Sequence, residues 1–350
     1  MRGVDTCYAP HTAAIAPNCE VRVLIYIARR ALMAVSVILV VLVATFLLFF
    51  AGPADPAQSM CGELRCSPQR LEDIRRSLGT DRPVAEQFSE YFKGLFVGRD
   101  IYVSGAPKTC EAPCLGFSFR TGIEVKEALG ARFPNTAMLA LMTMVIFLTV
   151  GVSTGVLAAR QRGTALDRGV VGFSQVFGSI PSYILGLLFA LYTTVLYPIL
   201  PRYANRADGL GPWFVGLIAP AIILGLIYAT GYVRYARASM VDTLNQDYVR
   251  TARSKGISEQ KVVYRHALRA ALSPVVTILG LDMAGLLSGT LVTEHIFGVD
   301  GIGKFAIESL RNDDLPIIMG TVLIGCVLVV VMNLVVDIAY SFLDPRVRLS

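Results

Sequence analysis

The chain of 350 residues is 54% hydrophobic and only 17% charged, with a formal net charge of +6 and a mean hydropathy of +0.58. Average soluble domains are about 25% charged, so this composition excludes a soluble enzyme, a disordered chain and a small disulfide scaffold. The positive charge comes without a nucleic-acid-binding motif, and no nucleic-acid partner is expected.

Six segments are apolar and long enough to cross a bilayer, whose hydrocarbon core of about 30 Å needs roughly 20 helical residues. Backbone polar groups in lipid must be satisfied within the segment, so we predict six transmembrane helices in an all-α membrane protein. The first is read as a retained anchor, because no small-residue cleavage site follows it. Gly178, Pro181 and Gly186 predict a kink in the third. The segments are residues 31–54, 133–159, 169–201, 209–233, 270–293 and 315–336.

Basic residues in the short loops predict the orientation. With six spans, the arginines before the first span, those near residue 165, the eight basic residues between Arg234 and Arg269 and those at the carboxyl end all fall on one side. We therefore predict a bacterial plasma-membrane protein with both termini cytoplasmic. Residues 1–20 are expected to be a disordered tail or an overcalled start.

The predicted organisation has five parts. Residues 1–22 form a cytoplasmic tail, 23–54 the first transmembrane helix and 55–132 an extracytoplasmic subdomain with helices at 68–79 and 83–95. Residues 133–345 form a core with helices two to six and a cytoplasmic loop at 238–272. Residues 346–350 are a cytoplasmic carboxyl terminus.

Four cysteines lie in the predicted extracytoplasmic subdomain, and an even number outside the membrane favours disulfides. Three connectivities are possible, of which we favour the local pairs Cys61–Cys66 and Cys110–Cys114. A zinc site made of the same four residues is the alternative. Its spacing is loose and thiols outside a cell oxidise, so no metal site is predicted.

The 238–272 loop has a distinct internal pattern. Asp247–Lys255 predicts a short helix on which Val249, Ala252 and Gly256 share a face, with Gly256 ending it in the left-handed conformation. Ser258 then caps a second helix at 259–272. Small residues on one face suit docking into a groove of another protein. The alternative is an ordinary basic loop beside anionic lipid.

The stretch Asp247-Tyr-Val-Arg-Thr-Ala-Arg-Ser-Lys-Gly256 resembles the signature loop of binding-protein-dependent ABC-importer permeases, close to that of dipeptide and oligopeptide permeases. The family pattern is Glu-Ala-Ala, three residues, Gly, nine residues, Ile-x-Leu-Pro. Aligned on Gly256, this chain has Arg250-Thr251-Ala252, then His266, Leu268 and Arg269, departures common in the peptide branch. Further segments that resemble the B-type member of the permease pair are 29–30, 52–56, 78–83, 132–136, 179–182, 237–240 and 343–346.

This resemblance implies a fold of the type I ABC-importer permease kind and a pore-forming subunit for di- or oligopeptides. It implies a second, C-type permease, two ATPases that use ATP and Mg, and an extracytoplasmic substrate-binding lipoprotein as partners. Relatives that carry haem or nickel chelates leave the substrate open. No catalytic residue and no cofactor is expected in this chain. The residues implied to couple to the ATPases are Asp247, Tyr248, Val249, Arg250, Thr251, Ala252, Arg253, Lys255 and Gly256.

Two other features point to different chemistry. Gly298 to Lys304 fits the spacing of a phosphate-binding loop, but Phe305 stands where a hydroxyl is needed, so a turn is predicted. Asp282 lies within the predicted fifth span, where a carboxylate is costly and a functional role is the default. It could face the pathway and meet a peptide amino group, form a salt bridge, or be the ion site of a self-sufficient secondary transporter. No inverted repeats support the last alternative.

Overall fold

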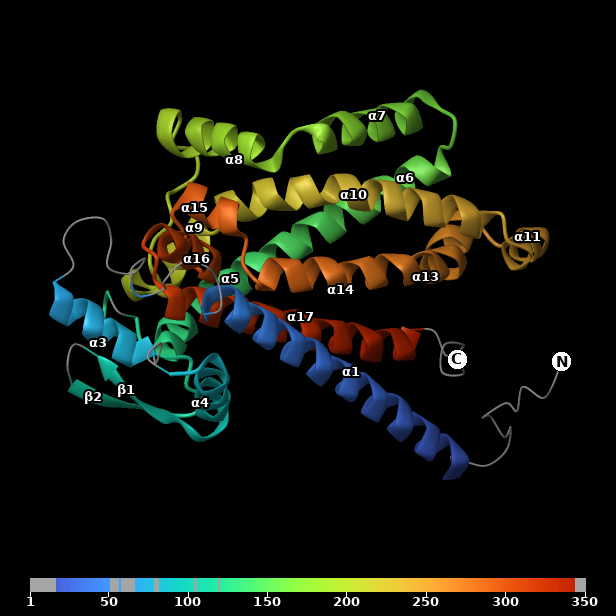
Figure 1. Ribbon diagram of the computed structural model, residues 1–350. Helices are drawn as coiled ribbons and strands as arrows, with labels where there is room; N and C mark the ends of the chain where they lie inside the picture. Colours follow the sequence, from blue (N-terminus) through green and yellow to red (C-terminus); the bar gives the residue numbers. More distant parts are fainter. Residues whose placement is uncertain are drawn as a thin grey trace.

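The computed structural model describes residues 17–50, 57, 67–78, 82–103, 106–118 and 120–343. The chain is mostly helical, as predicted, and its long helices lie roughly side by side (Figure 1). Four helical segments are long and apolar enough to cross a membrane, and there are six spans if each of two bent pairs is counted as one. This count agrees with the six predicted spans.

The four uninterrupted spans come from α1 (Pro17–Phe50), from α5 (Val125–Phe147) with the π-helical stretch η1 (Leu148–Val152) and α6 (Ser153–Arg160), from α9 (Leu210–Gly216) with α10 (Ile218–Leu244), and from α17 (Leu315–Leu343). All four helical segments extend beyond the predicted apolar segments. α5 begins at Val125, inside the predicted 55–132 subdomain, and α10 continues past Arg234 to Leu244. Helices continue where the sequence becomes charged because only the membrane-embedded part needs apolar residues.

The third predicted span is broken rather than continuous. α7 (Ala165–Ser179) meets α8 (Ser182–Ala190) and η2 (Leu191–Leu196) at an angle of 91°. Pro181 occupies the N-cap position of α8, and Ile180 and Pro181 have extended backbone angles. A proline lacks the N–H needed inside a helix, so the break falls where a kink was predicted.

The fifth predicted span, residues 270–293, is wrong at its carboxyl end. α14 (Ser273–Leu287) stops because Gly289 has a φ of +120° and packs against Gly303. A separate helix, α15 (Leu291–Phe297), follows, and then α16 (Ile302–Arg311). Towards its start, α14 bends by 49° from the chain before it, which runs through α12 (Glu259–Lys261), η4 (Val262–Ala267) and α13 (Leu268–Ala271).

The subdomain between α1 and α5 contains both predicted helices, α3 (Pro68–Leu78) and α4 (Val84–Val97). It also contains an antiparallel hairpin, β1 (Arg99–Val103) and β2 (Ala106–Cys110), which an all-α prediction missed. Cys110 and Cys114 form a disulfide with an S–S distance of 2.04 Å. Cys61 and Cys66, the other predicted pair, lie outside the described residues.

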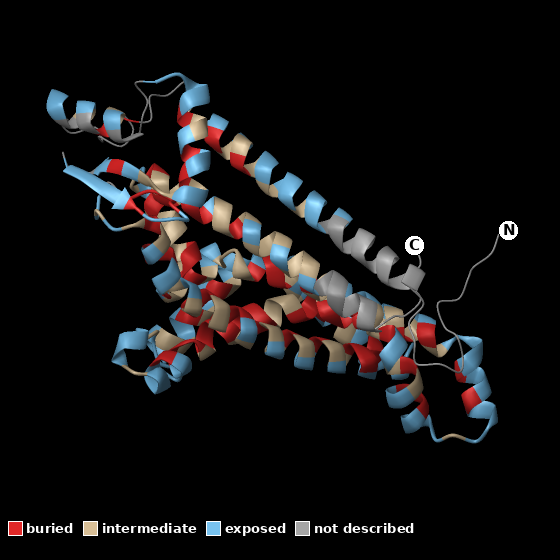
Figure 2. Ribbon diagram, turned by 90° about the horizontal axis from the view of Figure 1, so that it is seen from below, coloured by how far each residue is buried: buried red, intermediate tan, exposed pale blue. Residues whose placement is uncertain are grey.

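The two ends of the bundle carry different elements. The start of α1, the end of α17 and the short helix α11 (Asp247–Ser254) lie at one end, called here the α11 end (Figure 1). The subdomain, α15, α16 and the short helix η3 (Arg206–Asp208) lie at the other, the α16 end. Buried side chains concentrate among α5, α10 and α14, whereas the described side chains of α1 are mostly exposed (Figure 2).

Candidate functional site

α11, the helix predicted to couple to ATPases, packs on its own chain through its apolar face. It follows the end of α10 after a turn at Asn245 and Gln246. Val249 is fully buried and Ala252 is 6% exposed. Both join a cluster with Val156 of α6, Met240 of α10 and Val263 of η4. α11 therefore shares one apolar cluster with three membrane-linked segments.

The carboxyl end of α11 is closed by a Schellman motif. Gly256 N donates to the Arg253 carbonyl oxygen at 2.9 Å, and Ile257 N donates to the Ala252 carbonyl oxygen at 3.4 Å. Gly256 takes a φ of +76°, the left-handed conformation that glycine adopts most easily. Ile257 packs against the same cluster as Ala252. This agrees with the predicted end of the helix.

A bidentate ion pair fixes α11 to the segment after it. Arg253 Nε and Nη2 donate to the two carboxylate oxygens of Glu259 at 3.1 and 2.7 Å. Hydrogen bonding to Glu259 raises the pKa of the Arg253 guanidinium. Ser258 occupies the predicted N-cap position, but its side chain makes no capping hydrogen bond. The predicted continuous helix at 259–272 is instead divided into α12, η4 and α13.

The face of α11 that carries its small apolar residues is buried, and a different face is exposed. Val249 and Ala252, expected to dock into a partner, are covered by this chain itself. The face left open is polar and aromatic: Tyr248 is 49% exposed, and the Arg250 side chain is 68% exposed. The exposed residues on this helix and its cap are Asp247, Tyr248, Arg250, Thr251, Arg253, Ser254, Lys255 and Gly256.

A second ion pair joins two spans near the α11 end, and the sequence reasoning missed it. Arg237 Nε and Nη2 donate to the Asp167 carboxylate at 2.5 and 2.7 Å. Gly163 N donates to the same carboxylate at 2.9 Å, and Asp167 is 3% exposed. This pair ties the first turn of α7 to α10. Its residues are far apart in sequence, so only the position of Arg237 within the 237–240 resemblance hinted at a role.

Asp282 of α14 is oriented by Tyr232 of α10. The Tyr232 hydroxyl donates to Asp282 Oδ2 at 2.8 Å. Tyr232 is 1% exposed and its ring lies 4.5 Å from that of Phe147. The salt bridge considered for Asp282 is not found among the described residues, where its partner is this hydroxyl.

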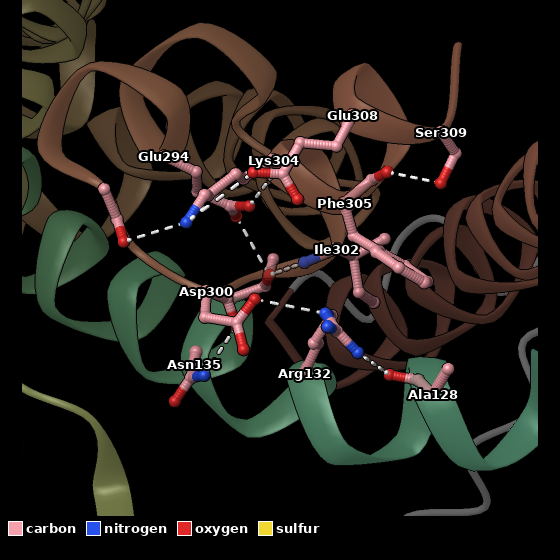
Figure 3. A network of polar contacts seen from close by, with 12 residues as sticks. Ala128, Arg132, Asn135, Glu294, Asp300, Ile302, Lys304, Phe305, Glu308 and Ser309 are labelled. Atoms are coloured by element: carbon pink, nitrogen blue, oxygen red, sulfur yellow. Dashed lines mark hydrogen bonds and ion pairs between the residues drawn. The ribbon is translucent and has the colours of Figure 1, made fainter. Parts of the chain in front are cut away.

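A polar network at the α16 end joins α5 to the turn between α15 and α16 (Figure 3). Arg132 Nε donates to Asp300 Oδ1 at 3.1 Å, and its guanidinium lies 3.9 Å from the ring centroid of Phe305. Asn135 Nδ2 donates to the Asp300 carbonyl oxygen at 2.6 Å and its Oδ1 accepts from Trp213 Nε1 at 2.7 Å. The 132–136 segment, quoted above for its resemblance, thus fixes a turn that lies far away in sequence.

Glu294 is the buried centre of this network. It is fully buried, and its carboxylate accepts from Thr136 Oγ1 at 2.9 Å, from Lys304 N at 3.0 Å and from Thr290 Oγ1 at 3.3 Å. Burial raises the pKa of Glu294, and these hydrogen bonds act in the opposite direction. The carboxylate therefore sits in a cradle of donors.

The cradle explains the spacing that resembled a phosphate-binding loop. The turn after α15 and the start of α16 direct the backbone N–H of Lys304 to the Glu294 carboxylate, so the anion held there belongs to the protein. A Cβ at Gly301 would lie 2.4 Å from Glu294 Oε2. The predicted turn is present before Ile302, and residues 302–304 begin α16. In the described part of the chain, no group of three or more His, Cys, Asp or Glu residues is arranged to hold a metal ion.

Comparisons with known proteins cover nearly the whole chain. Residues 151–349 match the family described as "Binding-protein-dependent transport system inner membrane component", and residues 23–140 match its amino-terminal counterpart. The "Probable peptide ABC transporter permease protein y4tP" of Sinorhizobium fredii is 34% identical over 326 residues, 93% of this chain and 99% of the relative. The "Dipeptide transport system permease protein DppB" of Escherichia coli is 32% identical over 348 residues, 92% of this chain and 98% of the relative.

Among solved structures, an inward-facing form of the MetNI methionine ABC transporter aligns with a TM-score of 0.47 and 18% identity, over 64% of this chain and 95% of that chain. The two family matches together span both the first helix and the core with α11. The relatives are matched over almost their full length. The chain therefore belongs to the binding-protein-dependent transport system inner membrane component family, the non-enzymatic, multi-pass permease subunits of ABC importers.

Proposed function

We propose that this chain is the B-type pore-forming subunit of an importer for di- and oligopeptides. It pairs with a C-type permease, receives substrate from an extracytoplasmic binding lipoprotein, and is driven by two ATPases that hold ATP and Mg. The relatives named as peptide and dipeptide permeases support the substrate class. The α11 end, with both chain termini, faces the cytoplasm, and the subdomain between α1 and α5 lies outside.

The two faces of α11 are the observation that carries this proposal. The buried face, with Val249 and Ala252, packs in one apolar cluster with residues of α6, α10 and η4, while Tyr248 and Arg250 remain exposed at the end of the bundle. A partner that binds the free face and moves would displace three segments connected to the spans, because packed interiors transmit displacement. In this proposal α11 passes the movement to the spans, and ATP hydrolysis by the ATPases supplies the energy.

The proposal is tested by isolating the tagged chain from its host in mild detergent and identifying what accompanies it. We expect a second permease, the ATPases and a binding lipoprotein, which is then screened against dipeptides, haem and nickel chelates. A chain with Tyr248→Ala and Arg250→Ala is expected to lose the ATPases but retain the second permease, since only the free face of α11 is changed. Recovery of the folded chain alone would contradict the proposal.

Asp282 distinguishes an ATP-driven permease from an ion-coupled transporter. We expect Asp282→Asn to retain ATP-dependent peptide uptake, because the asparagine Oδ1 still accepts from the Tyr232 hydroxyl at an unchanged position. Asp282→Leu leaves that buried hydroxyl without its acceptor, at a cost of about 1–3 kcal/mol, and should lower the yield of folded protein. Loss of uptake by a normally folded Asp282→Asn chain would indicate that the charge itself is required, as in a secondary transporter.

A further inference from the structure

One helix of the subdomain between α1 and α5 packs directly on the spans. α4 crosses the end of the bundle, whereas α1 and α17 run along it (Figure 1). The ring centroids of Phe88 in α4 and Phe46 in α1 lie 5.2 Å apart. Tyr91 of α4 and Met319 of α17 are buried in the same apolar cluster as Phe46. α4 takes no part in the α11 site or in the network around Glu294.

The contact between α4 and α1 lies near the edge of the hydrocarbon. The apolar window of α1, Ala31–Phe50, has 20 residues. At about 1.5 Å per residue, this window has the length of a hydrocarbon core of roughly 30 Å. Phe46 therefore lies about one helical turn inside the boundary at the α16 end. Phe88, which packs on Phe46, places α4 at the level of the membrane surface.

α4 carries a row of aromatic side chains that leads away from α1. Phe88, Phe92 and Phe96 follow one another at intervals of four residues and so share a face of the helix. The centroids of successive rings lie 6.1 and 5.3 Å apart. Phe88 is partly buried, whereas Phe92 is 37% exposed and Phe96 is 70% exposed. The row therefore begins in the contact with α1 and ends on a surface that the described part of the chain leaves open.

A second exposed flank of α4 is charged. Glu86, Glu90 and Lys93 are exposed and lie roughly 120° around the helix from the aromatic row, at about 100° per residue. Arg82, which precedes the helix, forms ion pairs with both glutamates. Charged residues are depleted in the buried centre of protein interfaces, so this flank suits water rather than a protein partner.

The order of these surfaces around α4 matches a boundary between lipid and water. The aromatic row borders the contact with α1, which spans the membrane. The charged flank borders the contact with β1, where a Cβ at Gly94 would lie 2.8 Å from Arg99 Cδ. Helices that lie in a membrane surface direct aromatic side chains to the acyl chains and charged side chains to water.

We propose that α4 is an interfacial helix whose Phe92 and Phe96 side chains insert among the phospholipids of the adjacent leaflet, while its charged flank stays in water. The partner is the boundary between headgroups and acyl chains, and no single headgroup is selected. The helix thereby holds the subdomain with the β1–β2 hairpin on the membrane surface. Only the identity of the leaflet, which is the outer one in the proposed orientation, rests on the proposed function.

The test is photo-cross-linking in the complete transporter, within the membrane of its host. The aromatic photo-cross-linker p-benzoylphenylalanine replaces Phe92, Phe96 or Lys93, one position at a time. Lys93 is the matched control, because it is exposed on the same helix but on the charged flank. After illumination the chain is purified and its adducts are identified by mass spectrometry. We expect lipid adducts at Phe92 and Phe96 to exceed those at Lys93 by about tenfold or more, since acyl chains give way to water across the helix.

A second comparison keeps the cross-linker at Phe92 and adds a negative charge on one flank or the other. Phe96→Glu is expected to lower the lipid adducts at Phe92 by about tenfold, because it removes the burial of an aromatic side chain and draws this end of α4 towards water. Lys93→Glu adds the same group on the charged flank and should leave the lipid adducts unchanged.

Two results would overturn the proposal. The first is a yield of lipid adducts at Phe96 no higher than at Lys93, whatever its absolute value. The second is cross-linking of Phe92 or Phe96 mainly to the second permease or to the binding lipoprotein, which would show that a protein covers the aromatic row. Both results are read on this chain, so they are distinct from a failure to recover the ATPases, which bears on the proposed function.

Discussion

Replacing Gly256 with valine is expected to leave the amount of folded permease close to that of wild type while sharply reducing peptide uptake per ATP hydrolysed. Gly256 has a φ of +76°, and no atom lies within 4 Å of the place where a Cβ would be added. The cost is therefore backbone strain rather than a clash, about 1–2 kcal/mol for a β-branched residue. That strain shifts the local equilibrium about 5- to 30-fold against the closed end of α11. Uptake and ATP hydrolysis are measured together in proteoliposomes that contain the complete transporter.

Gly298→Val is the matched control for this experiment. Gly298 ends α15 in the left-handed conformation, with a φ of +71° and open space where a Cβ would be added. Valine there meets the same strain but lies outside α11. We expect its uptake per ATP to stay near wild type. If both valine variants lowered this ratio equally, or if neither did, the special role of the α11 cap would be refuted.

Gly301→Ala is expected to lower the stability of the folded protein strongly, although it adds only one methyl group. Its Cβ would lie 2.4 Å from Glu294 Oε2 and 2.6 Å from Thr136 Oγ1. Gly301 has a φ of −105°, so alanine is not strained in its backbone, and the whole effect is steric. Moving the carboxylate breaks hydrogen bonds that are buried. Together these effects cost about 3 kcal/mol or more, seen as lower folded yield and a lower unfolding temperature in detergent.

Gly211→Ala provides the comparison, since Gly211 lies at the same end of the bundle and nothing lies within 4 Å of its Cβ position. It should unfold at the wild-type temperature. A Gly301→Ala protein as stable as Gly211→Ala would show that the α15–α16 turn can shift away from Glu294 at little cost. The tight cradle would then not be what holds this end of the bundle together.

The spans could be predicted because the bilayer imposes one strong condition, a long run of apolar residues. That condition does not determine where a helix begins or ends outside the membrane. The start of α5 at Val125 and the end of α10 at Leu244 were therefore missed. The end of α14 was missed for another reason. It depends on Gly289 meeting Gly303, a contact between residues that no local pattern connects.

In the functional site, too, features with a local sequence signal could be predicted and contacts made only on folding could not. Gly256 was predictable because a left-handed helix end has a local signal, a glycine. The free face of α11 was not, because an apolar face on a helix does not reveal whether the same chain or another covers it. Glu294 and Thr136 were missed as partners because they belong to separate segments joined only by folding. The spacing at Gly298–Lys304 indicated a loop of the kind that binds anions, but it gave no sign that the Glu294 carboxylate is the group bound there.

The two faces of α11 place neighbouring residues under different genetic constraints. A change at Val249 or Ala252 must be accommodated within the same polypeptide, because its neighbours belong to α6, α10 and η4. A change at Tyr248 or Arg250 alters a surface that this polypeptide leaves uncovered. If the ATPases bind that surface, as we propose, its compensation arises in the gene for the ATPase. The proposed role thus places on one short helix positions that evolve alone and positions that evolve with a second gene.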